Sequence, residues 1–240
     1  VAMFYDLDDP YPFACDVKDI LHDDGIWAMQ LSYTPLMIEQ LAFDNICHEH
    51  ICYYSLTSIK YLMDKVGFDI VDCVLDDVNG GSFRIFLMKK KADKSKFRNQ
   101  QQRDVANFRV NSLLAYEESL NLKDPQTYRD FYQEICRLRN KTVDFVLQEK
   151  AKGKSIWGYG ASTKGSTLMQ WYGLDINHID YIAERSPYKF GLRTAGTNIP
   201  ICSEGEMREA QPDYLLILPW HFIDEFSLRE SEYIKRGGKF

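Results

Sequence analysis

The chain of 240 residues is long enough for one large domain or two of ordinary size, and its 45% hydrophobic and 14% aromatic content suffices for packed cores. A net charge of −6 and a pI near 5.4 argue against nucleic-acid binding, for which a basic surplus is typical. No apolar run approaches the roughly 20 residues that cross a bilayer, and no basic-then-apolar leader opens the chain. Six cysteines without a C-x-x-C pair predict neither a disulfide framework nor a zinc ribbon, so we expect the reducing cytoplasm.

The first ninety residues are predicted to mix helices and strands. Apolar spacing predicts two helices, 12–22 and 56–66, and four strands: 1–5, 26–31, 68–75 and 83–88. Gly67 closes the second helix, and Gly25 is expected to end the first in the left-handed conformation. The last two strands flank a hairpin-type connection.

The pattern changes twice further along the chain. Residues 92–153 are polar and predicted to be helical, with one helix starting at Asp124-Pro125, an acid at the N-cap and a proline behind it. From Ser155 onward strands and a helix alternate, which predicts a parallel sheet with helical crossovers: strands 156–160, 179–183 and 214–218, and helix 164–172. A further strand is expected to start at 237–240. Because both ends of the chain are predicted to fall within strands, we interpret it as a fragment.

The densest group of reactive side chains is Cys47-His48-Glu49-His50, followed closely by Cys52, Tyr53 and Tyr54. Titratable groups crowd in this way where protons or metals are handled. Histidine is the natural general base near neutral pH, and a neighbouring carboxylate can fix its tautomer. Cysteine and histidine also ligate zinc, but consecutive residues of an extended segment alternate sides and make a poor tetrahedral set. Acid–base chemistry is therefore favoured over a metal site, with structural hydrogen bonding as a third interpretation.

A glycine-rich turn, Gly158-Tyr159-Gly160-Ala161-Ser162-Thr163-Lys164-Gly165, follows a predicted strand and opens a predicted helix. Glycines permit a tight turn and close backbone approach, and the helix N-terminus offers N–H groups to a phosphate. Ser162, Thr163 and Lys164 add hydroxyl and cationic donors. The spacing is neither the strict dinucleotide fingerprint nor a P-loop, so a packing turn without a ligand stays an alternative.

Three further groups are candidates for ligand binding. Glu184 follows the next predicted strand and is placed to meet a ribose or sugar hydroxyl. Gly80-Gly81-Ser82-Phe83-Arg84 is interpreted either as a bulged hairpin start or as a flat backbone surface beside a ligand, with Arg84 as an anion clamp. Trp220 and His221 follow the last predicted strand at its carboxyl end, where open parallel sheets bind ligands.

Together these segments resemble the sugar C-methyltransferase family, whose members methylate keto-deoxysugars attached to a nucleoside diphosphate. The resemblance runs nearly end to end through motifs in the family's order: MFYDLDDP, FDNICHEHICYYSL, NGGSFR, GYGASTKG, ERSPYKFG, GTNIPI, LPWHF and GGKF. It implies a zinc-binding N-terminal domain, a Rossmann-type methyltransferase domain and a Rossmann-like C-terminal domain that grips the nucleotide sugar.

On this resemblance the fold class is α/β. Residues 1–90 would be the second half of the methyltransferase domain, 91–153 a helical connector belonging to the C-terminal region, and 154–240 the Rossmann-like domain that binds the nucleotide sugar. S-adenosylmethionine would be the cofactor, although the glycine loop that holds it would lie outside this chain. Zinc is expected only in the missing N-terminal domain.

The resemblance also implies roles for single residues. His50 aligns with the family's proposed general base, which removes the proton next to the sugar ketone, and Glu49 aligns with a neighbouring carboxylate. Where many members have tyrosine, histidine and asparagine, this chain has Cys47, Asn79 and His221; the first bears on the ring position of the sugar and the third on the sugar-nucleotide site. The candidate substrate contacts are Cys47, Tyr53, Tyr54, Ser82, Arg84, Gly158, Gly160, Ala161, Ser162, Thr163, Lys164, Glu184, Trp220 and His221.

Two other functions stay open. The glycine turn also suggests a nicotinamide-dependent oxidoreductase or epimerase of nucleotide sugars, which requires a Tyr-x-x-x-Lys pair. Tyr61 with Lys65 is the sole match, far upstream of the glycine turn. The chain can also be a module that binds a nucleotide sugar without catalysis, because half of the cofactor site would be missing.

Overall fold

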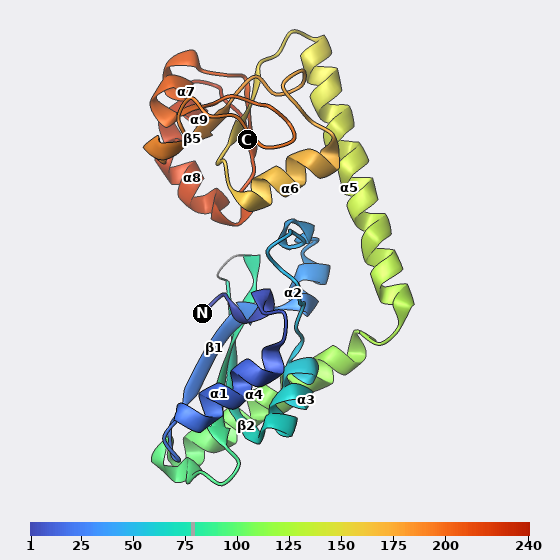
Figure 1. Ribbon diagram of the computed structural model, residues 1–240. Coiled ribbons are helices and arrows are strands. Elements are labelled where there is room, and N and C mark those ends of the chain that lie inside the picture. The colour runs from blue at the N-terminus through green and yellow to red at the C-terminus, as the bar shows by residue number, and fades with distance from the viewer. Residues whose placement is uncertain (78–79) are drawn as a thin grey trace. The chain divides into compact units, whose positions relative to one another are not determined.

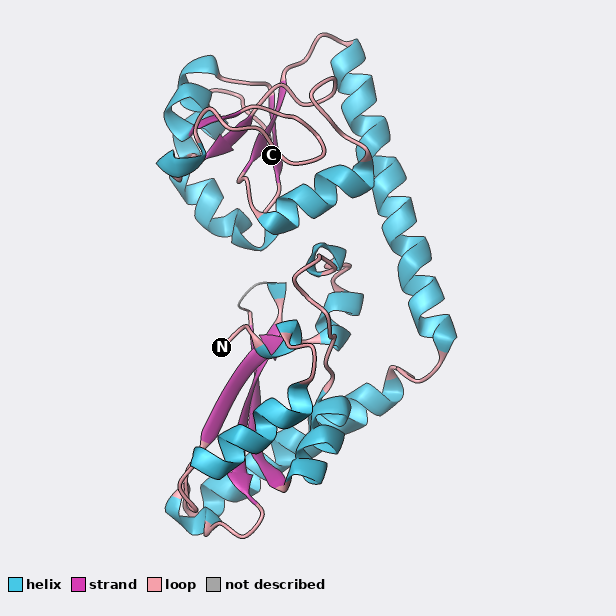
Figure 2. Cartoon of the chain, in the orientation of Figure 1, coloured by secondary structure: helices cyan, strands magenta, loops and turns pink. Residues whose placement is uncertain are grey.

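The computed structural model describes residues 1–77 and 80–240. The chain divides into two compact units, Val1–Phe131 and Tyr132–Phe240 (Figure 1). Each unit combines helices with one sheet, which confirms the α/β class (Figure 2). Asn79, which the family resemblance sets against a histidine, lies outside the described residues.

The first unit is built on a three-stranded antiparallel sheet in the order β1-β3-β2. Its strands are β1 (Trp27–Ser32), β2 (Phe68–Asp76) and β3 (Ser82–Lys89). The predicted hairpin is confirmed: β2 and β3 pair from Phe68 with Lys89 to Asp76 with Ser82, with a bulge at Val71. Alternate residues of β3 are buried on one face, as the two-residue period of a strand requires.

Helices cover that face of the sheet (Figure 1). They are α1 (Pro10–Ile20), α3 (Leu56–Val66) and α4 (Gln100–Ser119), with the shorter α2 (Thr34–Glu39) after β1 and the 3-10 turns η1 (Phe4–Asp6), η2 (Phe43–Asn45) and η4 (Lys94–Lys96). Ile59 and Met63 of α3 share a core with Ile85 and Leu87 of β3. The predicted helix 56–66 is confirmed, and Gly67 ends it with φ +103°.

Two expectations near the N-terminus are wrong. The strand over 1–5 is replaced by η1, because Phe4 and Tyr5 are both buried, and adjacent residues of a strand would point to opposite faces. Gly25 does not adopt the left-handed conformation. Glycine at this position avoids a steric clash instead, since a Cβ on residue 25 would lie 2.8 Å from Cγ of Leu21.

The second unit holds a four-stranded parallel sheet in the order β6-β5-β4-β7, which confirms the predicted parallel pairing. Its strands are β4 (Ile156–Tyr159), β5 (Ile182–Glu184), β6 (Ile201–Ser203) and β7 (Tyr214–Ile217). The helices are α6 (Thr163–Tyr172), α7 (Glu204–Ala210), α8 (Ile223–Arg229) and α9 (Ser231–Lys235), with 3-10 turns η5 (Pro187–Lys189) and η6 (Trp220–Phe222). Helix α5 (Pro125–Ala151) spans the boundary between the units.

Three details of this unit differ from expectation. Strand β5 starts three residues late, because Oδ1 of Asp175 accepts a hydrogen bond from Asn177 N and its carbonyl accepts one from Ile179 N, which holds that stretch in a turn. Strand β6 has only three residues and was not anticipated. The strand expected over 237–240 is reduced to a single bridge between Tyr214 and Lys239.

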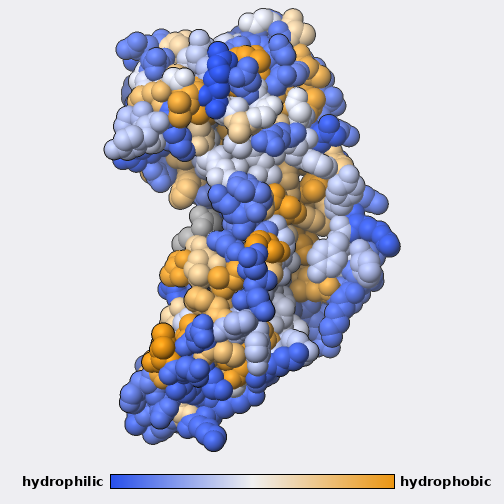
Figure 3. Space-filling view, in the orientation of Figure 1, coloured by the Kyte–Doolittle hydropathy of each residue, from blue (hydrophilic) through white to orange (hydrophobic). Residues whose placement is uncertain are grey.

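The visible surface is mostly polar (Figure 3). Hydrophilic side chains cover most of the visible face of each unit, with hydrophobic ones interspersed (Figure 3). Among residues 1–77 and 80–240, no helix is both long and apolar enough to span a membrane. All six cysteines are free thiols.

Candidate functional site

The segment that carries His50 is a turn and not the extended stretch that the sequence suggested. The 3-10 turn η2 ends at Asn45, and the carbonyl oxygen of Asn45 accepts a hydrogen bond from Cys47 N at 3.1 Å. His50 N then donates to the Cys47 carbonyl at 3.2 Å, which closes the turn. The alternation of sides that weighed against a metal site is therefore absent. Within the two described stretches, however, no three His, Cys, Asp or Glu side chains could hold a metal ion together.

The His50 ring is fixed in orientation and in tautomer. Its Nδ1 lies 2.8 Å from the backbone oxygen of Asn45, and the ring centroid lies 4.3 Å from that of Tyr5. A carbonyl oxygen can only accept, so Nδ1 carries the proton and donates. Nε2 of the neutral ring is left with its lone pair, which is the form that a general base requires.

Buried groups hold this turn in place. Asn45 is 2% exposed, and its side-chain amide donates to the Ala42 carbonyl at 3.0 Å. The carbonyl of Tyr5 accepts from both Ile51 N and Cys52 N at 3.0 Å. The turn is therefore tied at both sides to buried parts of the first unit.

The neighbours of His50 are distributed differently from expectation. The side chain of Glu49 is 55% exposed and lies 3.9 Å from Nε2 of His48, itself 82% exposed. The structure thus pairs Glu49 with His48, while a backbone carbonyl, and not a carboxylate, orients His50. Cys47 is half-buried.

The two tyrosines of the segment are separated by the fold. Tyr53 lines a cavity of about 860 Å³, beside the first turn of α3 and the end of α4. Burial, followed by the Cys47 and Cys52 side chains, raises the pKa of Tyr53. Tyr54 is buried in the core, with its ring centroid 5.6 Å from that of Phe4. Tyr53 is therefore the one with its side chain at a cavity.

Ser82 and Arg84 lie on β3 and are engaged within the sheet. The Ser82 hydroxyl accepts from the Gln30 amide at 3.1 Å. The Arg84 guanidinium donates to Gln30 Oε1 and to Asp76 Oδ2, each at 3.0 Å. The charge of the predicted anion clamp is thus already partly balanced by Asp76.

The glycine turn in the second unit is dictated by close packing. Gly160 has φ +89°, and a Cβ on it would lie 2.6 Å from Cγ of Pro219. A Cβ on Gly165, in the first turn of α6, would lie 3.0 Å from Cβ of Leu218. The turn after β4 therefore packs directly on the residues that follow β7.

That contact lies at a change of direction in the sheet. From β4 the chain passes to β5 and β6 on one side, and it later returns as β7 on the other side of β4. The carboxyl ends of β4 and β7 thus border a topological switch point, where open parallel sheets bind their ligands. The structure brings together here two groups that the sequence singled out separately: the glycine turn and Trp220 with His221.

Glu184 is engaged with the backbone of this turn. Its Oε2 accepts from Ala161 N at 2.8 Å, and its Oε1 accepts from Arg185 N and Ser186 N at 2.9 Å. Burial raises the pKa of Glu184, but these N–H groups and the Lys189 ammonium outweigh it and hold the pKa below its ordinary value. The carboxylate predicted to meet a sugar hydroxyl here holds the glycine turn against β5.

His221 is neutral at physiological pH. Burial, together with the positive charge of Lys164, lowers the pKa of His221 to about 4. Its Nδ1 is buried and has no hydrogen-bond partner among the residues that the structure describes. The adjacent Trp220 ring stands perpendicular to it at 5.7 Å.

Ser162 serves chiefly as a helix cap. Its hydroxyl accepts from Gly165 N at 3.0 Å, which makes it the N-cap of α6. Lys189, which the sequence did not single out, supports the turn from another side: its ammonium donates to the Ala161 carbonyl at 2.6 Å. The hydroxyl of Tyr159, within the turn motif, lies 2.8 Å from a carboxylate oxygen of Glu204 and from one of Glu230.

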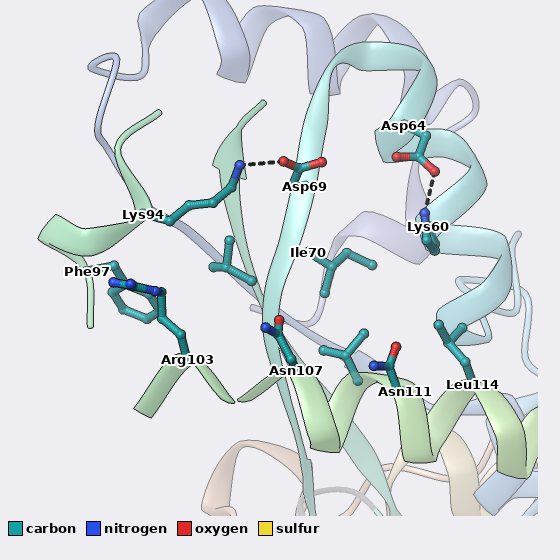
Figure 4. A pocket seen from close by; sticks show the side chains of 12 residues that line it. Lys60, Asp64, Asp69, Ile70, Lys94, Phe97, Arg103, Asn107, Asn111 and Leu114 are labelled. Atoms are coloured by element: carbon teal, nitrogen blue, oxygen red, sulfur yellow. Dashed lines mark hydrogen bonds and ion pairs between the residues drawn. The ribbon is translucent and has the colours of Figure 1, made fainter. Parts of the chain in front are cut away.

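A second cavity in the first unit contains none of the predicted site residues. It has a volume of about 420 Å³ and lies between α3, the edge strand β2 and α4 (Figure 4). Four of its five charged side chains form two ion pairs, Lys60 with Asp64 and Lys94 with Asp69, each at 2.6 Å, and the fifth is Arg103. The Tyr61–Lys65 pair required for a nicotinamide enzyme lies on α3, with the Lys65 ammonium 4.3 Å above the Tyr61 ring.

Residues 77–240 match the family described as the C-methyltransferase C-terminal domain. Over 224 residues the chain is 33% identical to C-methyltransferase NovU of Streptomyces niveus, covering 93% of this chain and 51% of that protein. The chain thus spans about half the length of the curated relative that it matches. Glutamyl-tRNA reductase from Methanopyrus kandleri aligns with 82% of this chain and 58% of its own at 10% identity, but its TM-score of 0.21 is too low to indicate a shared fold.

Proposed function

Because the chain belongs to the C-methyltransferase C-terminal domain family, we propose that it provides the proton-abstracting and sugar-binding parts of an S-adenosylmethionine-dependent sugar C-methyltransferase. The substrate is a keto-deoxysugar attached to a nucleoside diphosphate. The family assignment supports C-methylation, and the resemblance of the motifs to sugar C-methyltransferases supports the substrate class.

The contact between His50 and Asn45 carries the proposal for the chemical step. Nε2 of His50 takes the proton from the carbon next to the ketone, and the C–H bonding pair is delocalised onto the ketone oxygen as an enolate. The imidazolium that forms keeps its Nδ1–H hydrogen bond to the Asn45 carbonyl at 2.8 Å. Tyr53, whose side chain lines a cavity, is the proposed donor to the enolate oxygen, and Tyr54 is assigned to the core.

The described part of the first unit has no strand that leads through a glycine turn into a helix. S-adenosylmethionine supplies an electrophilic methyl group when bound, and its ribose and methionyl groups are usually held by a glycine turn between a strand and a helix. β1 leads instead into Tyr33, Thr34 and Pro35, and Gly80-Gly81 leads into strand β3. The role proposed for the first unit is therefore to bind and deprotonate the sugar.

The second unit is proposed to bind the nucleotide sugar at the switch point between β4 and β7. The glycine turn offers backbone N–H groups at the start of α6, and Lys164 supplies a cation for a diphosphate. His221, held neutral by burial, contributes a ring nitrogen that can bond to a hydroxyl or amide.

Proton removal can be measured apart from methyl transfer. We expect the protein, as its gene encodes it, to exchange the proton next to the ketone of a nucleoside-diphosphate keto-deoxysugar in D₂O without S-adenosylmethionine. Labelled methyl transfer to the same carbon then tests the full reaction. His50→Ala should abolish both activities, and the exposed His48→Ala is the matched control and should retain them.

Exchange that persists in His50→Ala would remove His50 as the base. Tight binding of the nucleotide sugar without exchange or methyl transfer would favour the second candidate, a binding module without catalysis. That candidate is supported by the switch-point geometry, which is complete within the second unit.

A further inference from the structure

Glu117 is a buried carboxylate that sequence reasoning did not single out. It lies near the end of α4 and is 3% exposed. Its Oε1 accepts from the Tyr33 hydroxyl at 2.7 Å and from Leu56 N at 2.5 Å. Its Oε2 accepts from Thr57 N at 2.8 Å and from the Thr57 hydroxyl at 2.6 Å. One side chain thus joins the end of β1, the first turn of α3 and α4.

These donors stand at the C-terminal end of the segment that carries His50. Tyr33 forms a parallel bridge with Tyr54, and Thr34 N donates to the Tyr54 carbonyl at 3.0 Å. Helix α3 begins two residues later, with a capping box between Ser55 and Ser58 that serves only the third N–H of the helix. Glu117 satisfies the two N–H groups that this box leaves open, so it fixes where α3 starts and where the His50 segment ends.

The carboxylate also borders the cavity that Tyr53 lines. Another wall residue, Thr34, is 8% exposed, and its hydroxyl has no partner among the described residues. Each carboxylate oxygen of Glu117 accepts two hydrogen bonds, so Glu117 has no lone pair left with which to act as a base itself. Burial and the hydrogen bond to Glu117 raise the pKa of Tyr33, which keeps that hydroxyl protonated as a donor.

We propose that Glu117 is a positioning residue for proton transfer: it holds the His50 segment and Tyr53 in the geometry that the reaction needs. This inference rests on the proposed function. A displacement of about 1 Å at a reacting group can cost about 100-fold in rate, so a residue that touches no substrate can still control kcat.

The test compares Glu117→Gln with Asp104→Asn, which makes the same carboxylate-to-amide change at an exposed residue of α4 that does not line the cavity. A glutamine amide would set its NH₂ against backbone donors, and at least one bond would be lost. We expect kcat for proton exchange, per folded molecule, to fall about 10- to 100-fold in Glu117→Gln. KM should change much less than kcat, and Asp104→Asn should match the wild type.

Two further variants keep the test decisive if Glu117→Gln does not fold. Thr57→Val and Tyr33→Phe each remove one hydroxyl donor and leave the carboxylate in place. Each should lower kcat several-fold and speed amide exchange at Leu56 and Thr57. A kcat within twofold of wild type in every folded variant would overturn the positioning role. Wild-type protein with neither proton exchange nor methyl transfer would instead overturn the proposed function.

Discussion

Nδ1 of His50 lies 2.8 Å from the backbone oxygen of Asn45, and this contact decides which ring nitrogen can act as a base. Because the acceptor is a backbone carbonyl, no titration of a neighbouring side chain can reverse the hydrogen bond. The residue types single out this segment, but this one contact determines which ring nitrogen of His50 keeps a lone pair that can accept a proton.

The tautomer of His50 can be observed directly. In the neutral ring we expect protonated Nδ1 and bare Nε2, which nitrogen-15 NMR of the imidazole distinguishes. His48 is the internal control, because its side chain is 82% exposed and no hydrogen bond to a carbonyl fixes it within the described residues, so it should show a mixture of tautomers. A neutral His50 ring protonated at Nε2 would contradict this assignment.

Gly160→Ala should destabilise the protein beyond the effect of its backbone conformation. The left-handed φ of +89° costs an alanine about 1 kcal/mol, and the contact at 2.6 Å with Pro219 should add about 1–3 kcal/mol. Gly153→Ala is the matched control, since Gly153 has φ +76° and nothing within 4 Å of its Cβ position. Urea unfolding measures both, and equal losses would show that the Pro219 contact is not limiting.

Glu184→Gln should loosen the glycine turn. It leaves an N–H donor group where Ala161, Arg185 and Ser186 need an acceptor, so we expect a loss of about 2 kcal/mol in unfolding free energy and weaker nucleotide-sugar binding. Glu209→Gln, on the exposed face of α7, should change stability by less than about 0.5 kcal/mol.

The pH dependence of this contribution has a definite sign. The folded pKa of Glu184 lies below its ordinary value of 4.5, so its stabilisation is present above pH 4.5 and is lost as the pH falls through the folded pKa. Unfolding measured across this range should show a smaller acid-induced loss in Glu184→Gln than in the wild type. Parallel curves would contradict a role for the ionised carboxylate.

His221 should make the protein less stable in mild acid. Its folded pKa of about 4 lies below the ordinary value of 6.5, so the unfolded chain binds the proton first as the pH falls. Stability should be fully present above pH 6.5 and should decline between pH 6.5 and about 4, by about 1–3 kcal/mol. His221→Asn removes the titrating group and should flatten that part of the curve. A persistent slope would assign it to other groups.

Local sequence patterns determined much of the secondary structure. Helix α3 and its Gly67 cap, the β2–β3 hairpin and the parallel pairing of the second sheet follow from hydrophobic period, glycine placement and the alternation of strands with helices. These features depend on residues close together in the chain, which is why the sequence predicts them. Strand β5 began later than expected because an aspartate turn competed with a pattern of apolar residues.

The sequence by itself also determined the residue types of the candidate site and the family to which they point. Only the tertiary structure decided what several of them do. It set a carbonyl, and not Glu49, against His50; it placed Tyr53 at a cavity and Tyr54 in the core; and it turned Glu184 toward backbone N–H groups. Glu117 shows the reason: its donors are 60 to 84 residues away in the chain, and no local pattern can specify such a contact.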